Sequence, residues 1–226
     1  MDPVSSRKLH ELYRTMLGCY GPQHWWPGDT PFEVMVGAVL TQSTNWRNVE
    51  KAIANLKASG VLDIRSLAEL PLEQMALLVR PSGYYNVKAK KLKALCQWLL
   101  QGFGGSLDNL FALDTVVLRQ ELLEVYGIGE ETADSIILYA AAKPVFVIDA
   151  YTRRIMGRLK LGPADGSYGG LQAYFMHNLS HDSALFNEFH ALFVRHGKDV
   201  CRKTGPRCAG CCLTRMCARQ SEGNRD

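Results

Sequence analysis

The chain has 226 residues, of which 47% are hydrophobic and 21% are charged, a composition typical of one large or two modest globular domains. No apolar run approaches the roughly 18 to 20 residues that a membrane-spanning helix needs, and the N-terminal segment lacks the apolar stretch of a signal peptide. We therefore expect a cytoplasmic protein (nucleoid-associated in a bacterium) without a membrane partner, and the net charge of +4 indicates nucleic acid only weakly.

Helical patterns follow one another along the chain, and strand patterns are nearly absent. Residues 32–42 are apolar almost all round, as in a helix buried in a core. In residues 45–60 apolar side chains recur at three- and four-residue spacing before Gly60, a natural helix end. Further helical patterns cover residues 66–79, 88–103, 114–127, 131–143, 150–162, 169–179 and 183–197. The connections are short, and we expect an all-α protein.

Basic residues gather in two places along the sequence. One group is Lys88, Lys90, Lys91 and Lys93, and the other runs from Arg195 to the C-terminus with eight Lys or Arg against three acids. Such patches attract phosphate backbones, although for either patch taken alone a solvated helix face is the favoured interpretation.

Five of the seven cysteines lie in one short segment, CRKTGPRCAGCCLTRMC. Cys201, Cys208, Cys211 and Cys217 follow the spacing C-x6-C-x2-C-x5-C, with Cys212 left over. In a reducing compartment four thiolates suit a metal centre better than disulfides, and the candidates are a structural zinc ion and an iron–sulfur cluster. Zinc ligands usually come as two close pairs, whereas this loop has a single C-x2-C, so the spacing favours the cluster.

Two further motifs lie before the cysteines. The stretch YGIGEETAD fits a helix, a tight turn at Gly127, Ile128 and Gly129, and a second helix; such a turn exposes backbone N–H groups to an anion but is also an ordinary helix connector. In PVFVIDAYTRR, Asp149 ends an apolar run and begins a helix, a position typical of an N-cap.

Together these motifs resemble the endonuclease III superfamily of DNA glycosylases, and the resemblance covers nearly the whole chain. The cysteine loop follows GIGEETA and VID by about fifty residues, and GAVLTQST, RPSGYYNVKAKKL and HGKDVC resemble other segments of that family. The resemblance implies a six-helix domain with the helix-hairpin-helix over residues 30–144. It implies a second helical domain, over residues 1–29 plus 145–226, that carries a [4Fe-4S] cluster on the four spaced cysteines.

The resemblance also assigns roles to single residues. The hairpin turn binds the DNA backbone, Gln42 fills the space that a flipped base leaves in the stack, and Asp149 stabilises the cationic sugar and directs water. The alternative for Gln42 is a capping or exposed polar role. Glu131 stands where lyase-competent members have a lysine, and a carboxylate forms no Schiff base. Three basic residues of the cluster loop are expected near DNA phosphate: Arg202, Lys203 and Arg207.

The base pocket resembles that of the 3-methyladenine glycosylase branch. Its expected residues are Trp25, Trp26, Pro27 and Trp46, although each tryptophan is also compatible with core packing. Indole rings suit an electron-poor, cationic base through stacking and cation–π attraction. This chain departs from that branch because it has all four cluster cysteines, which a member of that branch lacks. The departure weakens the inference about the substrate but leaves the inference about the fold unchanged.

We thus expect a monomeric, monofunctional DNA glycosylase of base excision repair that acts on double-stranded DNA containing a damaged base, an alkylated purine such as 3-methyladenine. One alternative is an endonuclease III-like glycosylase for oxidised or deaminated pyrimidines or mismatched bases. The other is a non-catalytic module that binds DNA lesions.

Overall fold

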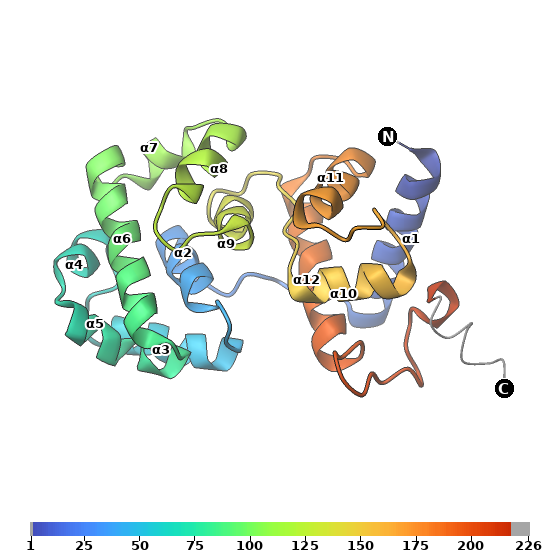
Figure 1. The fold of residues 1–226 in the computed structure, drawn as a ribbon, viewed down its shortest axis with the longest axis horizontal. Helices are drawn as coiled ribbons and strands as arrows, with labels where there is room; N and C mark the ends of the chain where they lie inside the picture. The colour runs from blue at the N-terminus through green and yellow to red at the C-terminus, as the bar shows by residue number, and fades with distance from the viewer. Residues whose placement is uncertain (1, 218–226) are drawn as a thin grey trace. The chain divides into compact units, whose positions relative to one another are not determined.

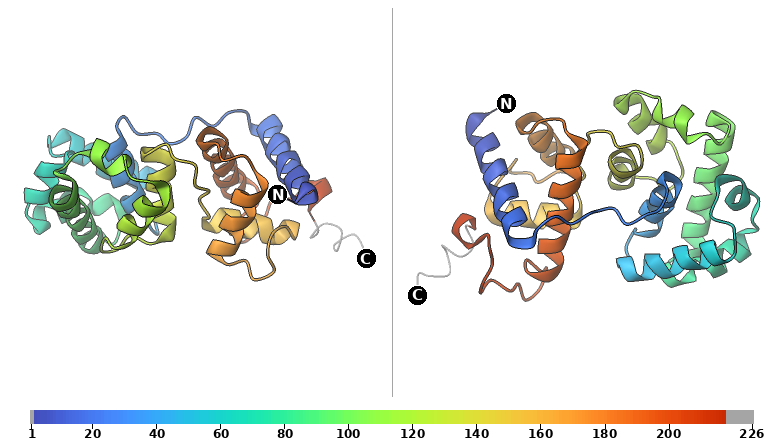
Figure 2. Two further views of the ribbon diagram at one scale, coloured as in Figure 1. Left: turned by 90° about the horizontal axis from the view of Figure 1, so that it is seen from above. Right: turned by 180° about the vertical axis from the view of Figure 1, so that it is seen from behind.

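A computed structural model describes residues 2–217 and divides the chain into two compact units. Unit 1 combines Met1–Trp25 with Pro144–Asp226, and unit 2 is Trp26–Lys143. The chain passes between them in segments without helix around residues 25–26 and 143–144 (Figure 2). The expected domain boundaries were 29/30 and 144/145, whereas the structure divides the chain at 25/26 and 143/144.

Between residues 2 and 217 the secondary structure is helical throughout, without a β-strand, so the expected all-α class is confirmed (Figure 1). In the same part of the chain no helix combines the length and the apolar character needed to cross a bilayer.

Unit 2 is built around two helices, the almost fully buried α2 and the long α6. Nine of the ten residues of α2 are buried, as its all-round apolar sequence predicts. Helices α4 and α5 pack against α6; they replace the single pattern of residues 66–79 because Pro71 interrupts it. The helices are α2 (Pro31–Leu40), α3 (Trp46–Ala58), α4 (Ile64–Glu69), α5 (Leu72–Leu78), α6 (Tyr85–Phe103), α7 (Leu107–Phe111), α8 (Thr115–Leu123) and α9 (Glu130–Ser135), with a 3-10 turn η1 (Arg80–Ser82) and a π-helical segment η2 (Ile136–Ala140).

Unit 1 encloses a core of phenylalanine rings. Phe146 stacks on Phe175 with ring centroids 3.8 Å apart, and Phe189 stacks on Phe193 at 5.0 Å. Phe146 belongs to the buried extended run 145–148, so the rings fix that run against α11 and α12. The helices are α1 (Pro3–Tyr20), α10 (Ala150–Leu159), α11 (Tyr168–Asn178) and α12 (Ser183–Asp199), followed by a 3-10 turn η3 (Thr214–Met216).

Candidate functional site

The turn between α8 and α9 has the geometry of a tight helical hairpin. Gly127 has φ +82°, a left-handed conformation that favours glycine, and Gly129 is the extended residue before α9. Ile128 between them is buried, and its N–H donates to the carbonyl of Val125 at 3.0 Å. The apolar side chain thus anchors the turn in unit 2, and at Gly129 a Cβ would meet nothing within 4 Å.

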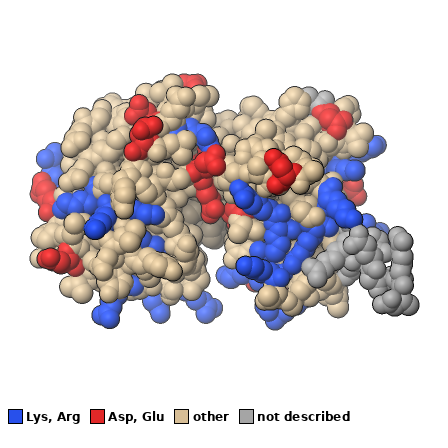
Figure 3. Space-filling model, in the orientation of Figure 1, with Lys and Arg blue, Asp and Glu red and all other residues tan. Residues whose placement is uncertain are grey.

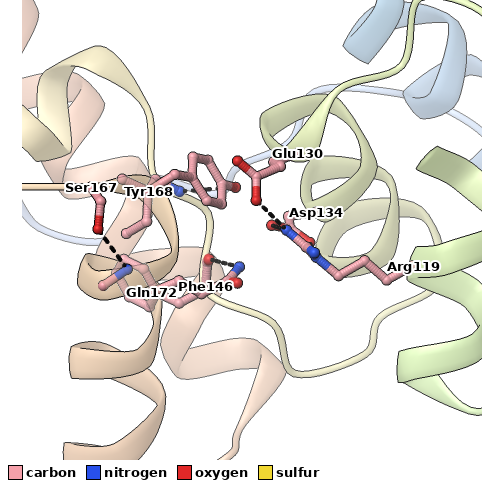
Figure 4. Close-up of polar contacts among 9 residues, drawn as sticks. Arg119, Glu130, Asp134, Phe146, Ser167, Tyr168 and Gln172 are labelled. Atoms are coloured by element: carbon pink, nitrogen blue, oxygen red, sulfur yellow. Dashed lines mark hydrogen bonds and ion pairs between the residues drawn. The ribbon is translucent and has the colours of Figure 1, made fainter.

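Arg119 of α8 binds the acidic face of α9 (Figure 4). Its Nε donates to Oδ1 of Asp134 at 2.7 Å and its Nη2 to Oδ2 at 3.2 Å, and Asp134 is fully buried. Nη2 also lies 3.3 Å from Oε1 of Glu130, whose side chain is half exposed. This pairing fixes the two helices of the hairpin together and partly neutralises the carboxylates beside the glycine turn. Glu131, which the resemblance places at the position of the family lysine, is exposed on the first turn of α9.

The expected basic group on α6 is largely taken up by hydrogen bonds inside unit 2. Lys88 is only 2% exposed, and its ammonium donates to the carbonyls of Leu40 and Ser82. Lys93 donates to a backbone carbonyl, and Lys91 donates to Oε1 of Gln42. This helix is therefore neither a uniform phosphate-binding patch nor a fully solvated face. The expectation was wrong for Lys88, because its charged side chain is buried and its ammonium group binds two backbone carbonyls.

Gln42 lies on the hairpin. Its Nε2 donates to the carbonyl of Gly127 at 3.0 Å and to Oγ1 of Thr132 at 2.9 Å. Its assigned role in filling the DNA stack stays a prediction, and the structure adds a contact that the sequence did not reveal.

Three aromatic rings of unit 2 lie edge to face or tilted against one another. Trp26 is 5.2 Å from Trp46 and 5.1 Å from Tyr139, measured between ring centroids. The tryptophans lie over Gly37 of α2, where a Cβ would come within 3.3 Å of Nε1 of Trp26. Tyr139 and Gly37 were missed by sequence reasoning; Tyr139 lies in the π-helical segment η2, a type of helix frequent at functional sites.

Pro27 and Trp46 line a pocket on unit 2. The remaining lining residues are Glu33, Glu50, Ile53, Ala54 and Lys57. Lys57 forms ion pairs with Asp29 at 2.7 Å and with Glu33 at 2.8 Å. Trp25, the fourth residue expected in the base pocket, belongs to unit 1.

Asp149 is the N-cap of α10, and it is buried. Its Oδ1 accepts a hydrogen bond from the backbone N–H of Thr152 at 2.7 Å, and its Oδ2 lies 3.7 Å from Nε2 of His190 on α12. Burial lowers the pKa of His190, although the Asp149 carboxylate opposes that effect. The other Asp149 oxygen is thus held beside an imidazole that favours its neutral form, so the N-cap role is realised without excluding a catalytic one.

The run before Asp149 is tied to α11 through its backbone (Figure 4). Gln172 Nε2 donates to the carbonyl of Phe146 at 2.9 Å, and the Ile148 N–H donates to the hydroxyl of Tyr168 at 3.4 Å. Together with the phenylalanine core, these bonds fix the approach to the aspartate.

The four spaced cysteines line one mostly apolar pocket between α10, the end of α12 and the C-terminal loop. Cys212 is not among its lining residues; its Sγ lies 3.9 Å from the hydroxyl of Tyr20. Arg158 Nη1 donates to Sγ of Cys201 at 3.0 Å. Within residues 2–217, no three Cys, His, Asp or Glu side chains converge closely enough to ligate a single metal ion.

Basic side chains gather on unit 1 in the region of α10 (Figure 3). Arg158 also donates to the carbonyls of Arg202 and Lys203, which fixes the start of the cysteine loop. Lys203 and Arg207 are exposed, and Arg202 is partly exposed, so all three remain accessible to a phosphate. The part of this basic group beyond residue 217 lies outside the described chain.

The predicted residues are thus distributed over both units. Unit 2 holds the hairpin, Gln42, Glu131 and three of the pocket residues, whereas unit 1 holds Asp149, Trp25 and the cysteine loop.

Comparison with known proteins finds a family model and relatives that match most of the chain. Residues 36–180 match the family model described as HhH-GPD superfamily base excision DNA repair protein. The "Putative DNA repair glycosylase MJ1434" of Methanocaldococcus jannaschii is 40% identical over 210 residues, which are 92% of this chain and 95% of that protein. Endonuclease III of Thermotoga maritima is 26% identical over 212 residues, 92% of each chain.

Solved structures are similar over most of the chain. The crystal structure of H. pylori 3-methyladenine DNA glycosylase (MagIII) bound to 1,N6-ethenoadenine has a TM-score of 0.73 at 32% identity, covering 86% of this chain and 97% of that one. A non-covalent endonuclease III–DNA complex has a TM-score of 0.83 at 21% identity, covering 98% and 99%, and so shares the fold.

Proposed function

Because this chain belongs to the HhH-GPD superfamily of base excision DNA repair proteins, we propose that it is a DNA glycosylase that excises an alkylated purine, such as 3-methyladenine, from double-stranded DNA without cutting the strand. Base excision by a glycosylase is the activity that its family membership carries; the choice of base and the absence of strand cleavage are added here.

The bond between the sugar C1′ and the base breaks with its electron pair leaving on the base. Asp149 stabilises the positive charge that develops on the sugar and accepts a proton from the water that attacks C1′. The products are a free base and an abasic site. The N-cap bond from Thr152 and the nearby imidazole of His190 hold the carboxyl group in place for this step.

The aromatic set on unit 2 carries the choice of base. Trp26 packs against both Trp46 and Tyr139, and Trp46 with Pro27 lines a pocket that also contains Glu50 and the ion pair of Glu33 with Lys57. The indole face and the carboxylate of Glu50 attract the positive charge of an alkylated purine. Such a base leaves neutral and needs no proton from the protein. The 32% identity to the H. pylori 3-methyladenine glycosylase supports the same choice.

The absence of strand cleavage follows from Glu131. Strand cleavage through a Schiff base needs a primary amine that attacks C1′. The exposed side chain at the position of the family lysine is a carboxylate here, and its neighbours on the first turn, Glu130 and Thr132, are not amines either.

The cysteine loop fits a [4Fe-4S] cluster held by Cys201, Cys208, Cys211 and Cys217. The four cysteines line one pocket, and their spacing, with a single C-x2-C, supports a cluster over zinc, whose ligands usually come as two close pairs. When bound, the cluster would crosslink the C-terminal loop and stabilise its fold. Iron and sulfide analysis tests this: Cys208→Ser should lower both contents, whereas the matched Cys212→Ser should retain them. Wild-type protein that contains zinc alone would contradict the assignment.

Defined lesions test the base. Duplexes that each carry one lesion are incubated with the protein, and freed bases are identified by mass spectrometry. We expect release of 3-methyladenine in preference to thymine glycol and uracil. The reverse preference would indicate the endonuclease III-like alternative. Binding to an abasic analogue without release of any base would indicate a lesion-binding module.

Trp46→Ala tests the pocket separately. Removal of the ring should slow release of the alkylated base by about 10-fold or more, since stacking contributes about 1–3 kcal/mol per base. Binding to an abasic duplex, which offers no base to stack, should change less. An equal loss in both measurements would assign Trp46 to packing of α3.

A further inference from the structure

Two lysines of α6 form hydrogen bonds to the C-terminal end of α2 and to the residues that follow it. Lys88 donates to the carbonyl of Leu40, the last residue of α2, at 2.8 Å, and also to the carbonyl of Ser82 at 2.6 Å. Lys91, one turn further on the same face, donates to Oε1 of Gln42 at 2.5 Å. The end of α2 and the second residue after it are therefore both fixed to α6.

Gln42 in turn forms hydrogen bonds to the hairpin, so it connects Lys91 to the turn. Both acceptors of its Nε2, the Gly127 carbonyl and Thr132 Oγ1, belong to the turn and to the first helical residues after it. The methylene groups of Lys91 lie against Gly127, because a Cβ there would come within 2.5 to 2.6 Å of its Cγ, Cδ and Cε. The glycine thus gives Lys91 the room to reach Gln42 beneath the turn.

The chemistry of the amide makes Lys91 the residue that orients it. An ammonium group only donates, so it selects the oxygen of Gln42 and turns both amide hydrogens toward the hairpin. The Gly127 carbonyl, which only accepts, selects the same orientation from the hairpin side. Without Lys91 the amide oxygen of Gln42 loses its donor, and the side chain is held from the hairpin alone.

We propose that Lys91 is a positioning residue for DNA binding, which orients Gln42 and through it the Gly127–Thr132 hairpin, rather than a phosphate contact. The proposal builds on the proposed function in one respect only, that the hairpin binds DNA; it does not require base release.

The salt dependence of binding separates the two roles. A lysine that neutralises one phosphate releases counterions, and its loss lowers the slope of log affinity against log salt by about 0.9. A lysine that acts through Gln42 leaves that slope unchanged, and its effect vanishes when Gln42 is already absent.

Binding to a duplex with a tetrahydrofuran abasic-site analogue is measured over a range of salt for wild type, Lys91→Met, Gln42→Ala and the double variant. Lys91→Met should weaken binding about 5- to 10-fold, as expected for a hydrogen bond to a charged group that is partly exposed. The slope should stay unchanged, and Lys91→Met should cause little further loss in the Gln42→Ala background. Lys90→Met, from the exposed neighbour on the same helix, reports what one lost charge does by itself.

Lys91→Arg, which keeps a donor, should restore most of the affinity. If Lys91→Met does not fold, the cycle of Gln42→Ala with Thr132→Val examines the same bridge from its hairpin end and should be equally non-additive. Additive losses, or a slope lowered by about one, would overturn the proposal. Intact coupling in a protein that releases no base would refute the proposed function alone.

Discussion

The carboxylate of Asp149 lies 3.7 Å from the imidazole of His190, and both side chains are buried in unit 1. Burial lowers the pKa of His190, although the Asp149 carboxylate opposes that effect, so the imidazole beside the aspartate favours its neutral form. In the proposed mechanism this carboxylate stabilises the cationic sugar, so its environment bears directly on that step.

Asp149→Asn should reduce base release by at least about 100-fold while DNA binding persists. Asparagine still accepts the hydrogen bond from Thr152, so α10 keeps its N-cap and the fold is preserved. Single-turnover release of base from a methylated duplex measures the effect, with circular dichroism as the folding control. Unchanged turnover would remove Asp149 from the mechanism.

Glu131→Lys should introduce covalent chemistry. The side chain is exposed, so the substitution costs little stability, and the new amine occupies the position of the family lysine. We expect an adduct that borohydride traps and that the Glu131→Gln control lacks. An adduct in neither variant would mean that position 131 lies away from C1′.

Arg119→Met should lower the free energy of unfolding by about 3 kcal/mol, because it leaves the fully buried carboxylate of Asp134 without its cation. Glu130→Gln breaks the other arm of the same arginine, where the carboxylate is half exposed, and should cost less than about 1 kcal/mol. Urea unfolding of both variants measures the difference. Equal costs would show that the two arms contribute alike.

Because of Lys88, the free energy of unfolding should depend on pH in the alkaline range. Burial first, and the charge of Lys91 second, lower its pKa to about 8. Between pH 8 and the ordinary lysine pKa near 10.4, the unfolded chain holds a proton that the folded chain has released, so this group adds stability as pH rises. Its neutral amine retains two N–H groups for the carbonyls of Leu40 and Ser82.

Urea unfolding at pH 7 and pH 9.5 compares wild type with Lys88→Met. The wild-type free energy of unfolding should rise relative to that of the variant as the pH increases. A parallel response of the two proteins would mean that Lys88 titrates normally.

The helices could be predicted from the sequence because their apolar spacing matches the burial that the structure has. The all-round apolar pattern of residues 32–42 became the buried α2, and the N-cap position of Asp149 is realised. Residues 66–79 have the apolar spacing of one helix, but Pro71 divides them into α4 and α5. The proline in the sequence is the signal that predicts this break.

The polar contacts of the site were not predictable because they join residues far apart in sequence. Gln42 meets Gly127 across 85 positions, and nothing in either segment encodes that approach. The charges near Lys88 and Lys91 indicated a nucleic-acid surface, but tertiary packing turned both lysines inward. Arg119 carries no local motif either, although the fully buried Asp134 made a basic partner necessary.

One experiment follows the fate of the sugar and the base together. Wild-type protein is incubated with a duplex that carries 3-methyladenine, in the presence and absence of borohydride, and free base, strand scission and covalent complex are quantified from the same reaction. We expect free base in amounts equal to the abasic sites, an intact strand until alkali is added, and no covalent complex. A trapped protein–DNA adduct, or a strand cut before alkali, would contradict an enzyme that uses Asp149 and water alone.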